Sequence, residues 1–233
     1  MIPAGLQTGY RAMLIVHHLN NSRSQRVLWL LEELGVSYEI VRYQRRPDMR
    51  APDDLRAIHP LGKSPVITDN GNTIAESGAI AEYLVSTYGN GRLIPLPDTP
   101  ERLRYSYWLH YAEGSAMPPL LLKLLFTVMP KRAPALLRPV VRKVSNQVLT
   151  AFVNPQLKMH MGFWENELSR SEWFAGDAFT AADIQMSFPL EAAEARGGLD
   201  QGHPKAMAFL DRIHARPAYK RALEKGGPYA VGR

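Results

Sequence analysis

Residues 13–43 read MLIVHHLNNSRSQRVLWLLEELGVSYEIVRY and contain the elements of an α/β unit. Met13–His17 is a short apolar run with β character, which predicts a buried strand. The apolar residues of Val27–Leu34 recur at helical spacing, and Gly35 stands where a helix commonly ends. Ser37–Tyr43 alternates in polarity and predicts a second strand. The run therefore predicts a β-α-β unit of about 30 residues.

The chain beyond this unit predicts two more strands and a helix. Pro65–Thr68 and Thr73–Ala75 are the predicted strands, and the Asn70-Gly71 dipeptide between them is the strongest short hairpin signal. Ser77 is expected to cap the helix that follows.

From Thr99 onward only helical periodicity is found, near residues 100–129, 134–168, 181–195 and 204–225. Pro118-Pro119 is expected to kink or end the first of these segments. We therefore expect four parts, namely an extension over 1–12, an α/β domain over 13–88, a linker over 89–98 and an all-helical domain over 99–233.

The composition excludes several classes of protein. The 233 residues contain no cysteine, so disulfides, thiolate metal sites and a cysteine nucleophile are excluded, and we expect no metal site. No apolar run has the ~18–20 residues that a membrane span needs, and the first 12 residues do not resemble a secretory signal. We expect a cytoplasmic protein with no membrane partner.

The net charge of +6 raises the alternative of a nucleic-acid partner. The basic residues cluster locally at Lys131, Arg132, Arg138, Arg142 and Lys143. A nucleic-acid site would place aromatic residues among them, and this stretch has none. A solvated helical face is the favoured interpretation, and nucleic acid is not expected as a partner.

Three short motifs carry the candidate chemistry. Asn21-Ser22-Arg23 precedes the first helix, whose free amide groups and dipole favour a thiolate brought by a ligand. As an alternative, Ser22 caps that helix in an S-x-x-Q capping box with Gln25.

The second motif is Lys63-Ser64-Pro65, where a cis proline would turn the backbone of Ser64 outward to pair with a peptide. Lys63 could hold a carboxylate. The third is Glu76-Ser77, which could receive an amino-acid head group at a helix start. The alternatives are an ordinary turn proline and an ordinary N-cap beside a surface acid.

The order and spacing of these motifs resemble those of the glutathione transferase family, from about Met13 to Leu223. The matching segments are RVLWLLEEL (26–34), HPLGKSPV (59–66), FAGD (174–177), TAADI (180–184) and RPAY (216–219). The resemblance implies a thioredoxin-like N-terminal domain followed by an all-α helical-bundle domain, the fold of these transferases. Thr180 and Asp183 are interpreted as a capping box that serves folding.

The resemblance also implies how glutathione is held. Ser64 would pair its backbone with the cysteinyl part, and Pro65 would be cis. Glu76 and Ser77 would hold the γ-glutamyl end, and Lys63 would hold the glycyl carboxylate.

The thiol position departs from the pattern of many family members, which carry Tyr, Ser or Cys five residues before the helix arginine. Counting back from Arg26 gives Asn21, which cannot be a nucleophile but can donate a hydrogen bond to a thiolate. Ser22 is the alternative donor. The nu-type bacterial members also resemble this pattern, and their disulfide and peroxide reduction keeps redox chemistry open.

Tyr107, Tyr111 and Ser115 follow one another at four-residue spacing and could line the electrophile pocket, with core or dimer packing as the alternative. The expected activity is conjugation of glutathione, as co-substrate, to a small hydrophobic electrophile. The alternatives are a glutathione-dependent disulfide oxidoreductase or peroxidase and a non-catalytic binding module. The resemblance implies a homodimer.

Overall fold

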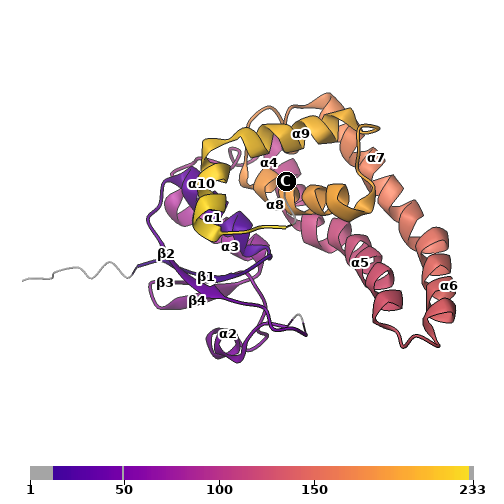
Figure 1. Ribbon diagram of the computed structural model, residues 1–233. Coiled ribbons are helices and arrows are strands. Elements are labelled where there is room, and N and C mark those ends of the chain that lie inside the picture. Colours follow the sequence, from indigo (N-terminus) through magenta and orange to yellow (C-terminus); the bar gives the residue numbers. More distant parts are fainter. Residues whose placement is uncertain (1–12, 49, 231–233) are drawn as a thin grey trace, which may run out of the picture.

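A computed structural model describes residues 13–48 and 50–230. Its N-terminal part is a four-stranded sheet in the order β2-β1-β3-β4, formed by β1 (Ile15–Leu19), β2 (Glu39–Tyr43), β3 (Val66–Asp69) and β4 (Asn72–Ala75). β1 runs parallel to β2 and antiparallel to β3, and β3 pairs antiparallel with β4. Helices α1 (Ser24–Leu34) and α3 (Ser77–Tyr88) cover one face, while the short α2 (Asp53–Ile58) lies on the other side (Figure 1). The predicted thioredoxin-like topology is confirmed.

The rest of the described chain is helical, which confirms the second domain as all-α. The helices are α4 (Pro100–Tyr111), α5 (Met117–Arg132), α6 (Arg138–Val148), α7 (Asn154–Arg170), α8 (Ala181–Ala192), α9 (Pro204–Ala215) and α10 (Pro217–Gly226). Three π-helical turns extend α4, α6 and α8, namely η1 (Ala112–Ala116), η2 (Leu149–Val153) and η3 (Ala193–Gly197). Every residue of α8 is buried, so this helix forms the centre of the domain.

Several local predictions are confirmed by backbone geometry. Gly35 ends α1 in the left-handed region, at φ 66°, and its amide donates to the carbonyl of Leu31. Asn70 and Gly71 both have positive φ and form the two-residue loop between β3 and β4. Thr180 and Asp183 form the predicted capping box at the start of α8.

Two expected helix boundaries differ from the structure. The helix does not end at Pro118-Pro119, because η1 leads directly into α5 and places these prolines in its first turn, where their missing amide is not needed. The single segment expected over 204–225 is two helices, α9 and α10, which meet at Pro217. A proline ring clashes with the carbonyl four residues before it, so the helix restarts there.

The predicted linker over 89–98 falls between α3 and α4, and the predicted extension over 1–12 lies outside the described residues. Among the described helices, none combines the length and apolar character that crossing a bilayer requires. The two domains are in close contact, since α1 of the first domain packs against α10 and α8 of the second as well as against α3 of its own. The loop between β1 and α1 thus lies beside residues from both domains.

Candidate functional site

Two of the predicted motifs meet at the start of α1. The hydroxyl of Ser22 lies 3.0 Å from the hydroxyl of Ser64, although 42 residues separate them in the sequence. The Ser64-Pro65 peptide bond is cis, as the resemblance implied. The loop before α1 and the loop before β3 therefore form one site.

The capping box predicted for Ser22 and Gln25 is wrong. The helix begins at Ser24, one residue later than the prediction requires, and its N-cap position is Arg23. The Ser22 hydroxyl accepts from the Ser24 amide at 3.2 Å, while the Gln25 amide donates to the backbone carbonyl of Ser22. The physical reason is that the Ser22 hydroxyl belongs to a chain of buried hydroxyl groups.

That chain runs from Ser64 through Ser22 and Ser24 to His18. The Ser22 and Ser24 hydroxyls lie 2.8 Å apart, and the Ser24 hydroxyl lies 2.8 Å from Nδ1 of His18. Burial lowers the pKa of His18 to about 4, and the charge of Arg42 adds to this effect. The ring is therefore neutral at physiological pH.

The Ser24 hydroxyl also lies 3.4 Å from the backbone carbonyl of Leu19 and can donate to it. The Ser22 hydroxyl lies between those of Ser24 and Ser64 and accepts from the Ser24 amide. A hydroxyl has one proton and two lone pairs, so these three partners within the protein are enough to occupy all of them.

Asn21 has different surroundings from Ser22. It is exposed and lies in the left-handed region at φ 49°. Its Oδ1 accepts from the backbone amide of Ala230 at 2.8 Å. The side-chain oxygen is therefore engaged with the segment after α10, which leaves the two N–H donors of the amide for other partners.

The Glu76-Ser77 motif lies at the start of α3, one residue out of the predicted register. The N-cap is Glu76, at φ 70° and ψ 122°, and Ser77 is the first helical residue, so the cap predicted at Ser77 is wrong. The buried Ser77 hydroxyl accepts from Nε2 of Gln185 at 2.9 Å and from Arg26 at 3.4 Å. These donors from α8 and α1 take up its acceptor positions and leave its own proton free to donate.

A partly buried ion-pair cluster joins the two domains next to this site. Glu113 accepts from Nε of Arg23 at 2.8 Å and from Nη2 of Arg26 at 2.5 Å. Burial alone would raise the pKa of Glu113, but the two guanidinium groups hold it below its usual range. Both guanidinium groups also lie over the ring of Phe188, at 4.9 and 5.2 Å from its centroid. Arg23, suggested by the sequence as a thiolate partner, is thus paired with a carboxylate.

The sequence alone assigned no role to His18, Ser24, Gln185 or Glu113. Each owes its place to a partner far away in the chain, and no local pattern indicates that partner. The one available signal was a polar residue inside an otherwise apolar element. Gln185, inside the fully buried α8, is the clearest example.

The residues predicted to line the electrophile pocket do not share one environment. Tyr107 is 48% exposed and stacks on Tyr111, which is buried. The Tyr111 hydroxyl accepts from Nε1 of Trp164 at 3.2 Å and is also bonded to His160, both on α7. Ser115 is exposed. Tyr111 is thus committed to packing against α7, which was the alternative interpretation of this stretch.

Lys63 is exposed, and no carboxylate within the described ranges comes within 4 Å of it. Its ammonium group is therefore available to an anionic ligand. In the part of the chain that the structure describes, no three histidine, aspartate or glutamate side chains gather as metal ligands would.

Two protein families match the chain. Residues 12–86 match the family described as "Glutathione S-transferase, N-terminal domain", and residues 128–217 match "Glutathione S-transferase, C-terminal domain". The chain is 37% identical to Glutathione S-transferase 3 of Schizosaccharomyces pombe over 213 residues, which are 91% of this chain and 88% of the relative. It is 33% identical to Glutathione S-transferase 1 of Saccharomyces cerevisiae, over 90% of this chain and 94% of the relative.

Solved structures agree with this match. A glutathione S-transferase from Actinobacillus pleuropneumoniae is 30% identical, covers 94% of each chain and superposes with a TM-score of 0.75. A sphingomonad glutathione S-transferase complexed with glutathione has a TM-score of 0.70 at 23% identity, over 91% of this chain and 98% of that one, and supports the fold alone. The sequence relatives and both domain matches thus agree with the geometry of the site, and the chain belongs to the glutathione S-transferase family.

Proposed function

We propose that the chain conjugates the thiolate of glutathione to a small hydrophobic electrophile, with Asn21 as the donor that stabilises the sulfur. The observation that carries this proposal is the bond from the Ala230 amide to Oδ1 of Asn21. It fixes the orientation of the side-chain amide, so that its N–H groups are available to a negatively charged sulfur.

Ser22 is the weaker candidate for the same role, because its hydroxyl lies within hydrogen-bond distance of the hydroxyls of Ser24 and Ser64 and accepts from the Ser24 amide. These three partners can occupy its one proton and its two lone pairs, which leaves no proton for a thiolate. We therefore assign Ser22 the task of holding Ser64 in place. Ser64 keeps its backbone groups for the cysteinyl part of glutathione.

We assign the γ-glutamyl end of glutathione to the start of α3. The free proton of the Ser77 hydroxyl and the first amides of the helix would bind its carboxylate, and Glu76 would bind its ammonium group. Glu76 has a positive φ, which is unfavourable for a side chain that is not glycine, and such positions cluster at ligand clamps. Lys63 would bind the glycyl carboxylate.

In the reaction, the sulfur lone pair forms the new S–C bond, and the leaving group departs with the electron pair of the bond that breaks. The thiol proton is lost to solvent when the thiolate forms. The protein supplies charge stabilisation through Asn21 and orientation through the bound peptide backbone. Tyr107 and Ser115 remain the proposed contacts of the electrophile, and Tyr111 would act through its stacking on Tyr107.

We also propose, from family membership, that the enzyme is a cytoplasmic homodimer with glutathione as its co-substrate. Light scattering at several protein concentrations measures the mass of the assembly. A mass of one chain at all concentrations contradicts the dimer.

Glutathione is expected to bind and to be used in conjugation. We expect retention on immobilised glutathione, a rise in melting temperature with millimolar glutathione, and turnover of a chlorinated aromatic substrate. Turnover of a small disulfide but not of the aromatic compound would instead support the reductase. Binding with neither activity would support a binding module, and no binding at all contradicts the proposal.

Asn21→Ala is expected to raise the apparent pKa of the thiol of bound glutathione by about one to two pH units, because one hydrogen bond to a charged group is lost. Ser22→Ala is the matched control, and it should weaken glutathione binding while leaving that thiol pKa nearly unchanged. The thiolate absorbance of the complex, titrated with pH, measures both. The reverse result would move the donor role to Ser22.

A further inference from the structure

The helical hairpin formed by α5 and α6 has an unusual charge composition. Residues 114–164 contain none of the 22 acidic residues of the chain. They contain seven of its 28 lysine and arginine residues, Lys123, Lys131, Arg132, Arg138, Arg142, Lys143 and Lys158. Six of these seven residues lie on α5 and α6, and the seventh, Lys158, lies on α7, so the net charge of +6 is carried by this part of the chain.

The tip of the hairpin also exposes large apolar side chains. It extends away from the sheet and from the glutathione site (Figure 1). Leu136, in the loop between the two helices, is 90% exposed, and its apolar neighbours are exposed by about half, namely Val140 63%, Leu137 53% and Met129 45%. A fully exposed leucine beside half-exposed apolar neighbours and lysine and arginine side chains is typical of protein segments that lie in a membrane interface.

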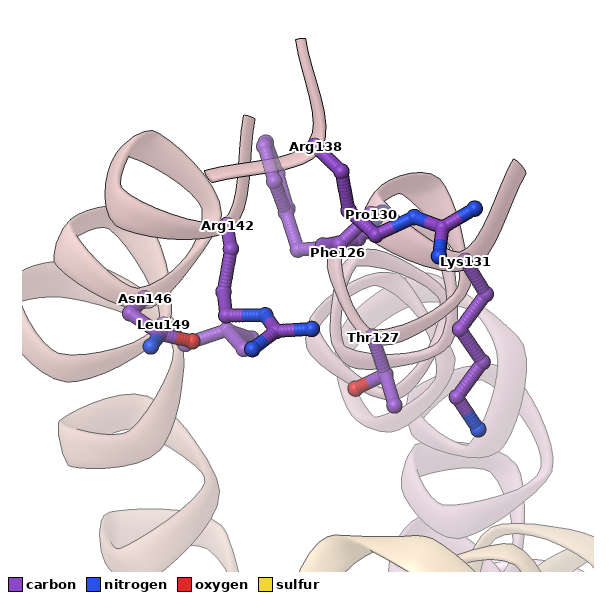
Figure 2. A pocket seen from close by; sticks show the side chains of 8 residues that line it. All are labelled: Phe126, Thr127, Pro130, Lys131, Arg138, Arg142, Asn146 and Leu149. Atoms are coloured by element: carbon purple, nitrogen blue, oxygen red, sulfur yellow. The ribbon is translucent and has the colours of Figure 1, made fainter. Parts of the chain in front are cut away.

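A cleft lies between the two helices at this tip. Its volume is about 400 Å³, and it is lined by Phe126, Thr127, Pro130, Lys131, Arg138, Arg142, Asn146 and Leu149. Figure 2 shows Arg138 and Arg142 reaching from α6 across the cleft toward α5, with Lys131 on the α5 side. Phe126, Pro130 and Leu149 supply an apolar wall. The cleft therefore combines three cationic groups with an apolar surface.

The three cations are not neutralised within the protein. Over the ranges that the structure describes, Lys131, Arg138 and Arg142 form no ion pair with a carboxylate. A phosphate group is the anion that arginine binds best in such a setting.

We infer that the tip of the α5–α6 hairpin docks on a bilayer surface that contains anionic phospholipids. A lipid phosphate would sit in the cleft between Arg138, Arg142 and Lys131, and Leu136 would enter the boundary of the acyl chains. The hairpin lies on the surface and does not cross the bilayer. This activity is separate from glutathione transfer.

A lipid explains both features of the tip, whereas the other anions explain one. Free phosphate or a nucleic acid backbone would satisfy the arginines but would leave Leu136 in water. Nucleic acid would in addition favour exposed aromatic side chains among the cations, and residues 129–144 contain none. Binding at a lipid surface buries the leucine and neutralises the cations together.

The test is cosedimentation of the full chain with vesicles at low and at physiological salt. Wild type should bind vesicles that contain phosphatidylglycerol and not vesicles of phosphatidylcholine alone. Arg138→Gln with Arg142→Gln should weaken binding about 25-fold, since each basic residue near an anionic surface contributes about fivefold. Leu136→Ser should weaken the part of the binding that persists at higher salt.

The matched control removes the same charge elsewhere. Lys205→Gln with Lys220→Gln changes two exposed lysines on α9 and α10 and should change binding severalfold less. Equal effects of the two double variants, or failure of wild type to bind anionic vesicles, would overturn the inference. Inorganic phosphate and chloride are then compared at equal ionic strength for how much protein each releases from the vesicles. If phosphate releases far more, the inference is overturned in favour of a soluble phosphate ligand.

Discussion

Replacement of Arg26 by methionine is expected to lower the free energy of unfolding by about 3 kcal/mol. The guanidinium group is 3% exposed and donates to the Gln185 carbonyl, to the Ser77 hydroxyl and to Glu113. Methionine keeps much of the volume but leaves the buried Gln185 carbonyl without this donor, and it removes one of the donors of Ser77 and of Glu113. Urea unfolding followed by tryptophan fluorescence measures the loss.

Arg23→Met is the matched control for this experiment. Arg23 binds the same Glu113 oxygen and lies over the same Phe188 ring, but its side chain is 34% exposed. Water can replace its hydrogen bonds, so a loss of about 1 kcal/mol or less is expected. Similar losses of unfolding free energy for the two variants would show that burial does not decide how much each arginine of this cluster contributes to stability. The Arg26 variant should also weaken glutathione binding, because it frees the Ser77 hydroxyl.

Replacement of Asp183 by alanine is expected to cost about 3–5 kcal/mol, because it removes several hydrogen bonds at once. Its carboxyl group accepts from the amide of Phe174 at 2.8 Å, and from the amide and hydroxyl of Thr180 at 2.8 and 3.0 Å. These groups are buried and have no access to water that could replace the bonds. Equilibrium unfolding of the purified variant measures the cost, and a loss below 1 kcal/mol would contradict this role.

The pH dependence of the same site provides an independent measurement. Burial raises the pKa of Asp183 from 3.8 to about 6, although its hydrogen bonds oppose that change. The pKa of Asp183 is higher in the folded protein than in the unfolded chain. Its contribution to the free energy of unfolding is therefore fully present below pH 3.8 and is lost as the pH rises through 6. Relative to Asp183→Asn, the wild type should therefore lose about 3 kcal/mol between these pH values. A constant difference between the two proteins over this range would contradict the raised pKa.

Features that depend on neighbours in sequence were predictable. Gly35 ends a helix because it adopts a positive φ without strain, and Asn70-Gly71 forms a hairpin for the same reason. Thr180 and Asp183 cap their helix across three residues. In each of these cases the interacting groups lie within one turn of the chain, so the motif contains its own partners.

Features that depend on distant partners were not predictable from the residues alone. Ser22 has the spacing of a helix cap, but its hydroxyl is held by Ser64, 42 residues away. Tyr111 has the spacing of a pocket residue, but Trp164 and His160 of α7 hold its hydroxyl. For polar side chains in this protein, tertiary contacts therefore override local pattern.

The packing of α10 on α1 has a consequence for the synthesis of the protein in the cell. Domains generally fold as units during translation, the N-terminal one first. Here Glu32 of α1 is bonded to Arg221 and Lys225 of α10, and Glu33 of α1 is bonded to Arg216 at its start. The side of α1 that packs on α10 therefore stays uncovered until α10, translated after the other described helices, has left the ribosome. If the ribosome stalls in the second domain, chaperones and proteases would have access to this side of α1.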